Sequence, residues 1–171
     1  MPISLLNLLK QGDRKEVGKA ADITSIIIET PALMSNLIDC VVNGDETVRS
    51  HAAHALMQLA HTHIDLLHPQ AHRLLDELLP LPQWEIQEQL SKFLPKLHLS
   101  DSQTQRVIHH LHKNLSHKSA IVRTCALQAL FDFSQADKTL KISIKTIINR
   151  AMKHGPKSLQ ARARKLNKEL S

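Results

Sequence analysis

Residues 48–59 read VRSHAAHALMQL, and this stretch decides the fold. Its apolar residues Val48, Ala52, Ala55 and Leu59 recur at spacings of four, three and four, which places them on one face of an α-helix. Three further segments align with it without gaps: residues 86–97 (IQEQLSKFLPKL), 122–133 (VRTCALQALFDF) and 159–170 (LQARARKLNKEL). The four segments start 38, 36 and 37 residues apart, so the sequence contains a repeat with one amphipathic helix in each copy.

Another helix is predicted before each of these segments. The intervening apolar patterns predict helices over residues 32–43, 69–79, 102–116 and 138–153. Prolines fall where helices should begin, and Gly44 and Gly155 fall where helices should end. A looser copy over residues 5–10 and 13–28 would form a first pair, with Val17, Ala20, Ala21 and Ile28 as its apolar residues. The predicted unit is therefore a helix, a short turn and a second helix.

Helix pairs of this kind predict an elongated array. One pair cannot cover its own apolar face, so stacked pairs bury a continuous core between neighbours. We expect a single all-α domain over residues 1–171, in which about five helix pairs form a right-handed α–α superhelix, or solenoid. The pairs cover approximately residues 1–30, 31–62, 63–98, 101–135 and 137–171.

The second helices resemble those of HEAT repeats. Residues 45–56 (DETVRSHAAHAL) carry an acidic residue at the turn and Val-Arg at the helix start, as that family typically does. Residues 119–130 (SAIVRTCALQAL) repeat the pattern with a serine at the turn. The two remaining segments are similar, except that Gln87 and Gln160 replace the usual arginine. The resemblance covers about residues 32–171 and implies a HEAT-like solenoid with a long concave surface, built by the second helices.

The composition argues against an enzyme. Glycine occurs only four times, so a glycine-rich phosphate loop is nearly excluded, and no GxSxG-type motif occurs. We expect no catalytic residues, no cofactor and no small-molecule substrate.

Three features bear on where the protein is located. Cys40 and Cys125 form no CxxC motif, and no signal peptide is recognised. The longest uncharged run, residues 23–28, is too short to cross a bilayer. These features predict a cytoplasmic protein that does not enter a membrane.

The stacked second helices are expected to bind a protein partner. Their exposed inner face is predicted to carry the side chains at recurring positions of the repeat: His54, Met57, Glu88, Lys92, Thr124, Gln128 and Phe131. Met57 and Phe131 are apolar where exposure is expected, which makes them candidate anchors. Trp84, the only tryptophan, either packs against the turn before its helix or serves as a further anchor.

The charge distribution favours an alternative to protein binding. Residues 1–85 hold 6 Lys/Arg and 11 Asp/Glu, whereas residues 86–171 hold 16 and 5. A candidate phosphate-binding patch for nucleic acid lies at the basic C-terminal end: Lys153, Lys157, Arg162, Arg164, Lys165 and Lys168. A solvated terminal cap explains the same residues. The resemblance to HEAT repeats implies a second alternative, a HEAT-like DNA glycosylase. Its chemistry needs aromatic side chains beside a carboxylate, and the inner face offers Glu88 but few aromatics.

The twelve histidines are candidate metal ligands. Three pairs are close in sequence: His51 and His54, His61 and His63, and His109 and His112. A spacing of three places two rings on one side of a helix, which suits a metal ion. No glutamate or cysteine completes a recognisable ligand set. We therefore interpret them as polar surface histidines and expect no metal.

Overall fold

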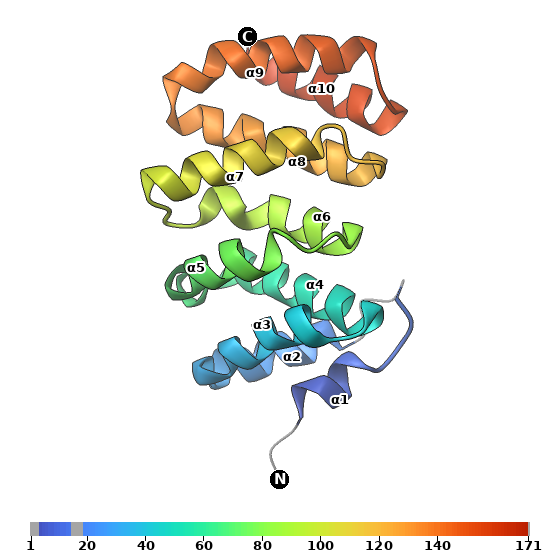
Figure 1. The fold of residues 1–171 in the computed structure, drawn as a ribbon, viewed down its shortest axis with the longest axis vertical. Coiled ribbons are helices and arrows are strands. Elements are labelled where there is room, and N and C mark those ends of the chain that lie inside the picture. Colours follow the sequence, from blue (N-terminus) through green and yellow to red (C-terminus); the bar gives the residue numbers. More distant parts are fainter. Residues whose placement is uncertain (1–3, 15–18, 171) are drawn as a thin grey trace. The chain divides into compact units, whose positions relative to one another are not determined.

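The computed structural model describes residues 4–14 and 19–170 (Figure 1). Helices make up 82% of the structure and no strand occurs in these residues, which confirms the prediction of an all-helical protein. The chain divides into two compact units, residues 1–99 and 100–171, here called the N-terminal unit and the C-terminal unit. The single five-pair array predicted from the repeat stays a prediction.

The N-terminal unit contains six α-helices in its described residues. They are α1 (Leu5–Leu9), α2 (Ala20–Glu29), α3 (Met34–Asn43), α4 (Glu46–Thr62), α5 (Ala71–Arg73) and α6 (Trp84–Phe93). Short 3₁₀ turns precede or follow several of them: η1 (Pro31–Leu33), η2 (Ile64–Leu66), η3 (His68–Gln70) and η5 (Leu94–Lys96). A π-helical turn, η4 (Leu74–Leu78), extends α5. The long helix α4 is central, because it packs against α2, α3 and α6.

The C-terminal unit contains four longer helices. They are α7 (Asp101–Asn114), α8 (Ala120–Ala136), α9 (Lys138–Lys153) and α10 (Lys157–Leu170). Helix α8 packs against α7, α9 and α10, and α9 also packs against α10. Gly155 forms the turn between α9 and α10 with φ +107°, a left-handed conformation that favours glycine. The helix end predicted at this glycine is therefore confirmed.

The residues that the repeat predicts as apolar form the core of both units. In α4, Val48, Ala52, Ala55 and Leu59 are at most 1% exposed. Most equivalent positions in the other three repeat segments are also buried: Ile86, Leu90, Phe93, Leu97, Val122, Ala126, Ala129, Leu159, Ala163 and Leu166. The last position of the third and fourth segments differs, because Phe133 and Leu170 are only half-buried. Burial of a large apolar side chain contributes about 1.5–3 kcal/mol, so these stripes are a main source of stability within each unit.

The first predicted pair is only partly as expected. Helix α2 begins at Ala20, seven residues after the predicted start, and buries Ile23 and Ile27. Ala21 and Ile28, which the sequence pattern grouped with the apolar residues of this helix, are both exposed, Ile28 to 39%. Val17 lies outside the described residues. The looser register of this segment made its buried face hard to predict.

Candidate binding surfaces

Three of the predicted inner-face residues lie close together on α4 and α6 of the N-terminal unit. Lys92 Nζ lies 2.7 Å from Glu88 Oε1, one helical turn away. His54 on α4 is half-buried beside this pair, and Gln58 Nε2 lies 3.1 Å from His54 Nε2. Burial, and secondarily the Lys92 ammonium, lower the pKa of His54, although Glu88 opposes the shift. This small polar surface is thus largely satisfied by its own contacts.

Met57 and Trp84 differ in exposure. Met57 is half-buried on α4, so it offers only part of its side chain to a partner. Trp84 is 38% exposed at the first position of α6. An indole exposed to this degree keeps contact area available for a protein partner.

The predicted anchor Phe131 was assigned wrongly, because it is only 4% exposed. Its helix α8 packs against three other helices of the C-terminal unit, so it buries more than the single face that the repeat pattern describes. Thr124 and Gln128 on the same helix are half-buried. Thr124 Oγ1 lies 3.3 Å from Ser158 Oγ, and Arg162 donates to Gln128 Oε1 at 2.8 Å. These contacts connect α8 to α10.

The basic residues of α10 form a stripe on its solvent side. Lys157, Arg164 and Lys168 follow one another at spacings of seven and four residues, which places them on one helix face. Lys165 lies beside them, and all four side chains are exposed. We call these four residues the α10 stripe. The buried face of α10 carries Leu159, Ala163 and Leu166 on the opposite side.

Two residues of the predicted patch are not part of this stripe. Arg162 turns toward Gln128 on α8, and Lys153 is exposed in the last turn of α9.

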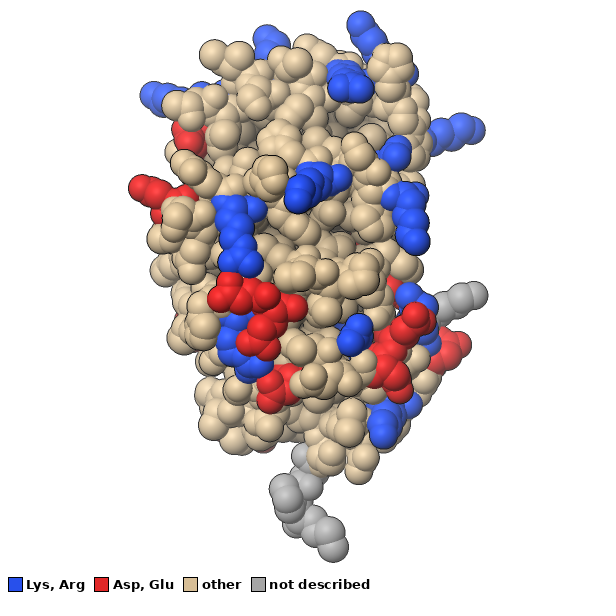
Figure 2. Space-filling model, in the orientation of Figure 1, with Lys and Arg blue, Asp and Glu red and all other residues tan. Residues whose placement is uncertain are grey.

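The Lys and Arg side chains of α9 and α10 make no ion pair with any residue that the structure describes. In the N-terminal unit, by contrast, Arg14, Lys19, Arg73 and Lys92 are all ion-paired. On the face shown in Figure 2, blue side chains predominate over the C-terminal unit, and most red ones lie over the N-terminal unit.

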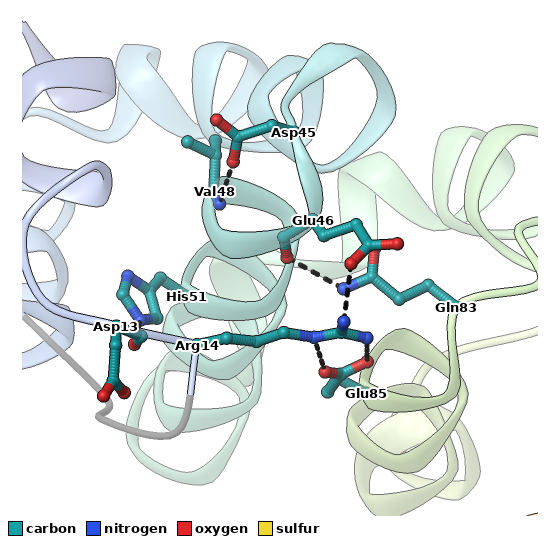
Figure 3. Close-up of polar contacts among 8 residues, drawn as sticks. All are labelled: Asp13, Arg14, Asp45, Glu46, Val48, His51, Gln83 and Glu85. Atoms are coloured by element: carbon teal, nitrogen blue, oxygen red, sulfur yellow. Dashed lines mark hydrogen bonds and ion pairs between the residues drawn. The ribbon is translucent and has the colours of Figure 1, made fainter.

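Sequence reasoning missed a polar cluster around Arg14 (Figure 3). The Arg14 guanidinium contacts both carboxylate oxygens of Glu85, with Nη2 to Oε2 at 2.9 Å, and Nη1 reaches Glu46 Oε2 at 2.5 Å. Burial alone would raise the pKa of Glu85, but the hydrogen bond from Arg14 and one from the backbone hold that pKa below its ordinary value. Arg14 thereby connects the segment before α2 to the starts of α4 and α6.

His51 on α4 holds the same N-terminal segment, so its interpretation as a surface histidine is wrong. It is 1% exposed, and its ring nitrogens lie 2.9 Å from Leu9 O and 2.8 Å from Asp13 O. Figure 3 shows His51 beside Asp13. No sequence signal pointed to these contacts, because the partners lie 42 and 38 residues away. The separation of 71 residues between Arg14 and Glu85 hides their pairing in the same way.

No gathering of three or more His, Cys, Asp or Glu side chains within residues 4–14 and 19–170 could hold a metal ion. Among the same residues, none of the helices has the length and apolarity needed to cross a membrane.

In comparisons with known proteins, no protein-family model matches the sequence, and no curated protein or solved structure matches it significantly.

Proposed function

We propose that this chain is a non-catalytic binding protein whose C-terminal unit contacts the phosphates of nucleic acid through the α10 stripe. The observation that carries this proposal is the exposure of four basic side chains on one helix face without ion-pair partners among the described residues. From Lys157 to Lys168 the stripe spans about 16 Å of helix. Duplex DNA carries about one negative charge per 1.7 Å of its axis, so the stripe can meet several phosphates.

The charge of the whole C-terminal unit supports the same partner. Residues 100–171 hold 14 Lys/Arg and four Asp/Glu, a formal net charge of +10. A positive field of this size attracts polyanions and raises the rate of encounter. Phosphate contacts carry no sequence information, and α10 has no aromatic side chain for base stacking. We therefore expect binding that depends on charge and not on base sequence.

The proposal of a non-catalytic role rests on the polar groups of the inner face. A base-excising enzyme needs a carboxylate that is available to the reacting base, whereas Glu88 is bound to Lys92 at 2.7 Å. The aromatic residue nearest to Glu88 in sequence, Trp84, lies at the start of the same helix. A glycosylase-type reaction at this surface is accordingly disfavoured.

The test is the anisotropy of a labelled duplex oligonucleotide titrated with the full chain. If the four stripe residues contact phosphates, raising salt from about 50 to about 200 mM should weaken binding roughly 100-fold. Replacing Lys157, Arg164 and Lys168 together with glutamine should reduce the slope of log K against log salt by about 3. No measurable binding at low salt would reject the proposal.

A control variant of equal charge separates the stripe from net charge alone. Lys138, Lys141 and Lys145 are exposed on α9, and their replacement with glutamine removes the same three charges. This variant should keep most of the duplex affinity. An equal loss in the two triple variants would show that the α10 stripe is not the contact surface.

We further propose that the helix pairs continue one stacking arrangement along the chain, as a right-handed superhelix of five HEAT-like pairs. Support comes from the common phase of the four second helices and from the packing of neighbouring pairs within each unit. An experimentally determined structure of the full chain tests the arrangement. A structure in which the apolar helix faces of all pairs meet around one common centre would overturn it.

Protein binding by the N-terminal unit is the second candidate function, and the exposed Trp84 favours it. Co-purification from the native host, after nuclease treatment, should retain a partner with the unchanged chain and lose it with Trp84→Ala. Because Trp84 is the only tryptophan, a shift of its fluorescence on addition of that partner provides a direct readout. A partner held equally well by both chains would exclude Trp84 as an anchor.

A further inference from the structure

The C-terminal unit carries a basic cavity, open to solvent on one side, that is apart from the α10 stripe. It has a volume of about 430 Å³ and lies where the ends of α7 and α9 meet the beginnings of α8 and α10. Its polar lining consists of His112, Ser116, Arg123, Arg150 and His154, and the remaining side chains that line it are apolar. No carboxylate lines the cavity, so its charge is not neutralised from within.

Arg123 and Arg150 have guanidinium N–H groups that are available to a ligand. Arg123 is fixed by its Nε, which donates to the carbonyl oxygen of His117 at 2.5 Å. The terminal nitrogens of Arg123 make no hydrogen bond or ion pair with the residues that the structure describes, and the same holds for the guanidinium of exposed Arg150. A guanidinium presents a planar fork that matches the oxygens of a phosphate. Imidazoles add N–H donors in either charge state.

Helix electrostatics explain only part of this cluster. His112 lies in the last turn of α7, and Arg150 and His154 lie at the end of α9, where positive side chains interact favourably with the helix dipole. Arg123, however, lies in the first turn of α8, where a positive charge is unfavourable. An anionic ligand in the cavity would offset this cost.

We propose that this cavity binds a phosphate group, held between Arg123 and Arg150 with the two imidazoles as further donors. The cavity has the size of ordinary small-ligand sites, and its apolar walls can contact the organic part of a phosphate ester. The phosphate belongs either to a small phosphorylated molecule or to a nucleic-acid chain. The site is separate from the α10 stripe, so it does not depend on the function proposed above.

Calorimetric titration of the full chain with inorganic pyrophosphate tests the site. We expect a dissociation constant below about 1 mM. Arg123→Gln and Arg150→Gln should each weaken binding by at least about tenfold, since each removes a charge-assisted pair. Arg123→Gln removes the hydrogen bond to the His117 carbonyl oxygen and can thereby disturb the turn before α8. Arg150 is exposed, so Arg150→Gln tests the site without this disturbance. The matched control replaces Lys141 and Lys145 with glutamine and should change the affinity less than about twofold.

The outcomes are distinct. No heat of binding at about 10 mM pyrophosphate, or an equal loss in the lysine control, would overturn the proposal. A single-stranded oligonucleotide that pyrophosphate displaces identifies a nucleic-acid phosphate as the ligand, whereas pyrophosphate bound alongside the oligonucleotide identifies a small phosphorylated molecule. The triple α10 stripe variant should keep pyrophosphate affinity while losing duplex affinity, so failure of one proposal is separable from failure of the other.

Discussion

Arg14→Ala is expected to destabilise the N-terminal unit by about 3 kcal/mol. The Glu85 side chain is only 7% exposed, and removal of the guanidinium leaves its carboxylate buried without a countercharge. The Arg14 side chain itself is 37% exposed, so solvent screens part of the interaction and the effect falls at the lower end for buried pairs. Urea unfolding followed by the fluorescence of Trp84 measures the loss, because the only tryptophan lies in this unit.

The effect should depend on pH in a defined direction. Because the pKa of Glu85 is held below its ordinary value, the pair stabilises the folded state above that ordinary value. This stabilisation is lost as the pH falls through the lowered pKa. The difference between the unchanged chain and Arg14→Ala should therefore be largest near neutral pH and shrink in acid. Glu85→Gln in the Arg14→Ala background should recover part of the loss, since the amide buries no charge.

Lys19→Ala provides the matched control for Arg14→Ala. Lys19 pairs with Asp22 at 3.7 Å, and both side chains are more than half exposed. Removal of such a surface pair changes stability by less than about 1 kcal/mol. If Arg14→Ala cost no more than Lys19→Ala, the Arg14 contacts to Glu85 and Glu46 would not stabilise the unit.

Periodicity predicted the helices and their buried faces because both depend on nearby residues. Apolar residues four and three positions apart share one helix face whatever the rest of the chain does, so the stripe from Val48 to Leu59 was predictable. The burial of Phe131 was not, because it depends on how many helices surround α8. The same limit applies to the candidate surfaces: the basic residues of α10 were identified, but the turn of Arg162 toward Gln128 depends on packing.

Long-range polar contacts were beyond this kind of reasoning. The pairing of Arg14 with Glu85 joins positions 71 residues apart, and neither residue carries a local signal for the other. The basic cavity escaped notice for a related reason. Its lining comes from the ends of four helices, and only the packing of these helices brings Arg123 and Arg150 to one place.

Gly44 shows that a correct prediction can have a different physical cause. A glycine at a helix end commonly supplies a left-handed conformation, but Gly44 has φ −70°, which any residue adopts. What the position requires is space. A Cβ there would lie 2.4 Å from Val48 Cγ1 and 2.5 Å from the carbonyl oxygen of Cys40. The close approach of α3 to the start of α4 thus depends on the missing side chain.

Gly44→Ala should accordingly destabilise the N-terminal unit by about 3 kcal/mol, at the upper end for overpacking. The cost should be smaller in a Val48→Ala background, measured as a double-mutant cycle, because the shortest contact, with Val48 Cγ1, is gone. The contact of 2.8 Å with the Cβ at position 48 remains. The cost should not vanish, since the Cys40 oxygen belongs to the backbone and cannot move without distorting α3. Asn43→Ala at the neighbouring exposed position should change stability by less than about 0.5 kcal/mol. Equal urea midpoints for Gly44→Ala and Asn43→Ala would mean that the turn between α3 and α4 is looser than this packing requires.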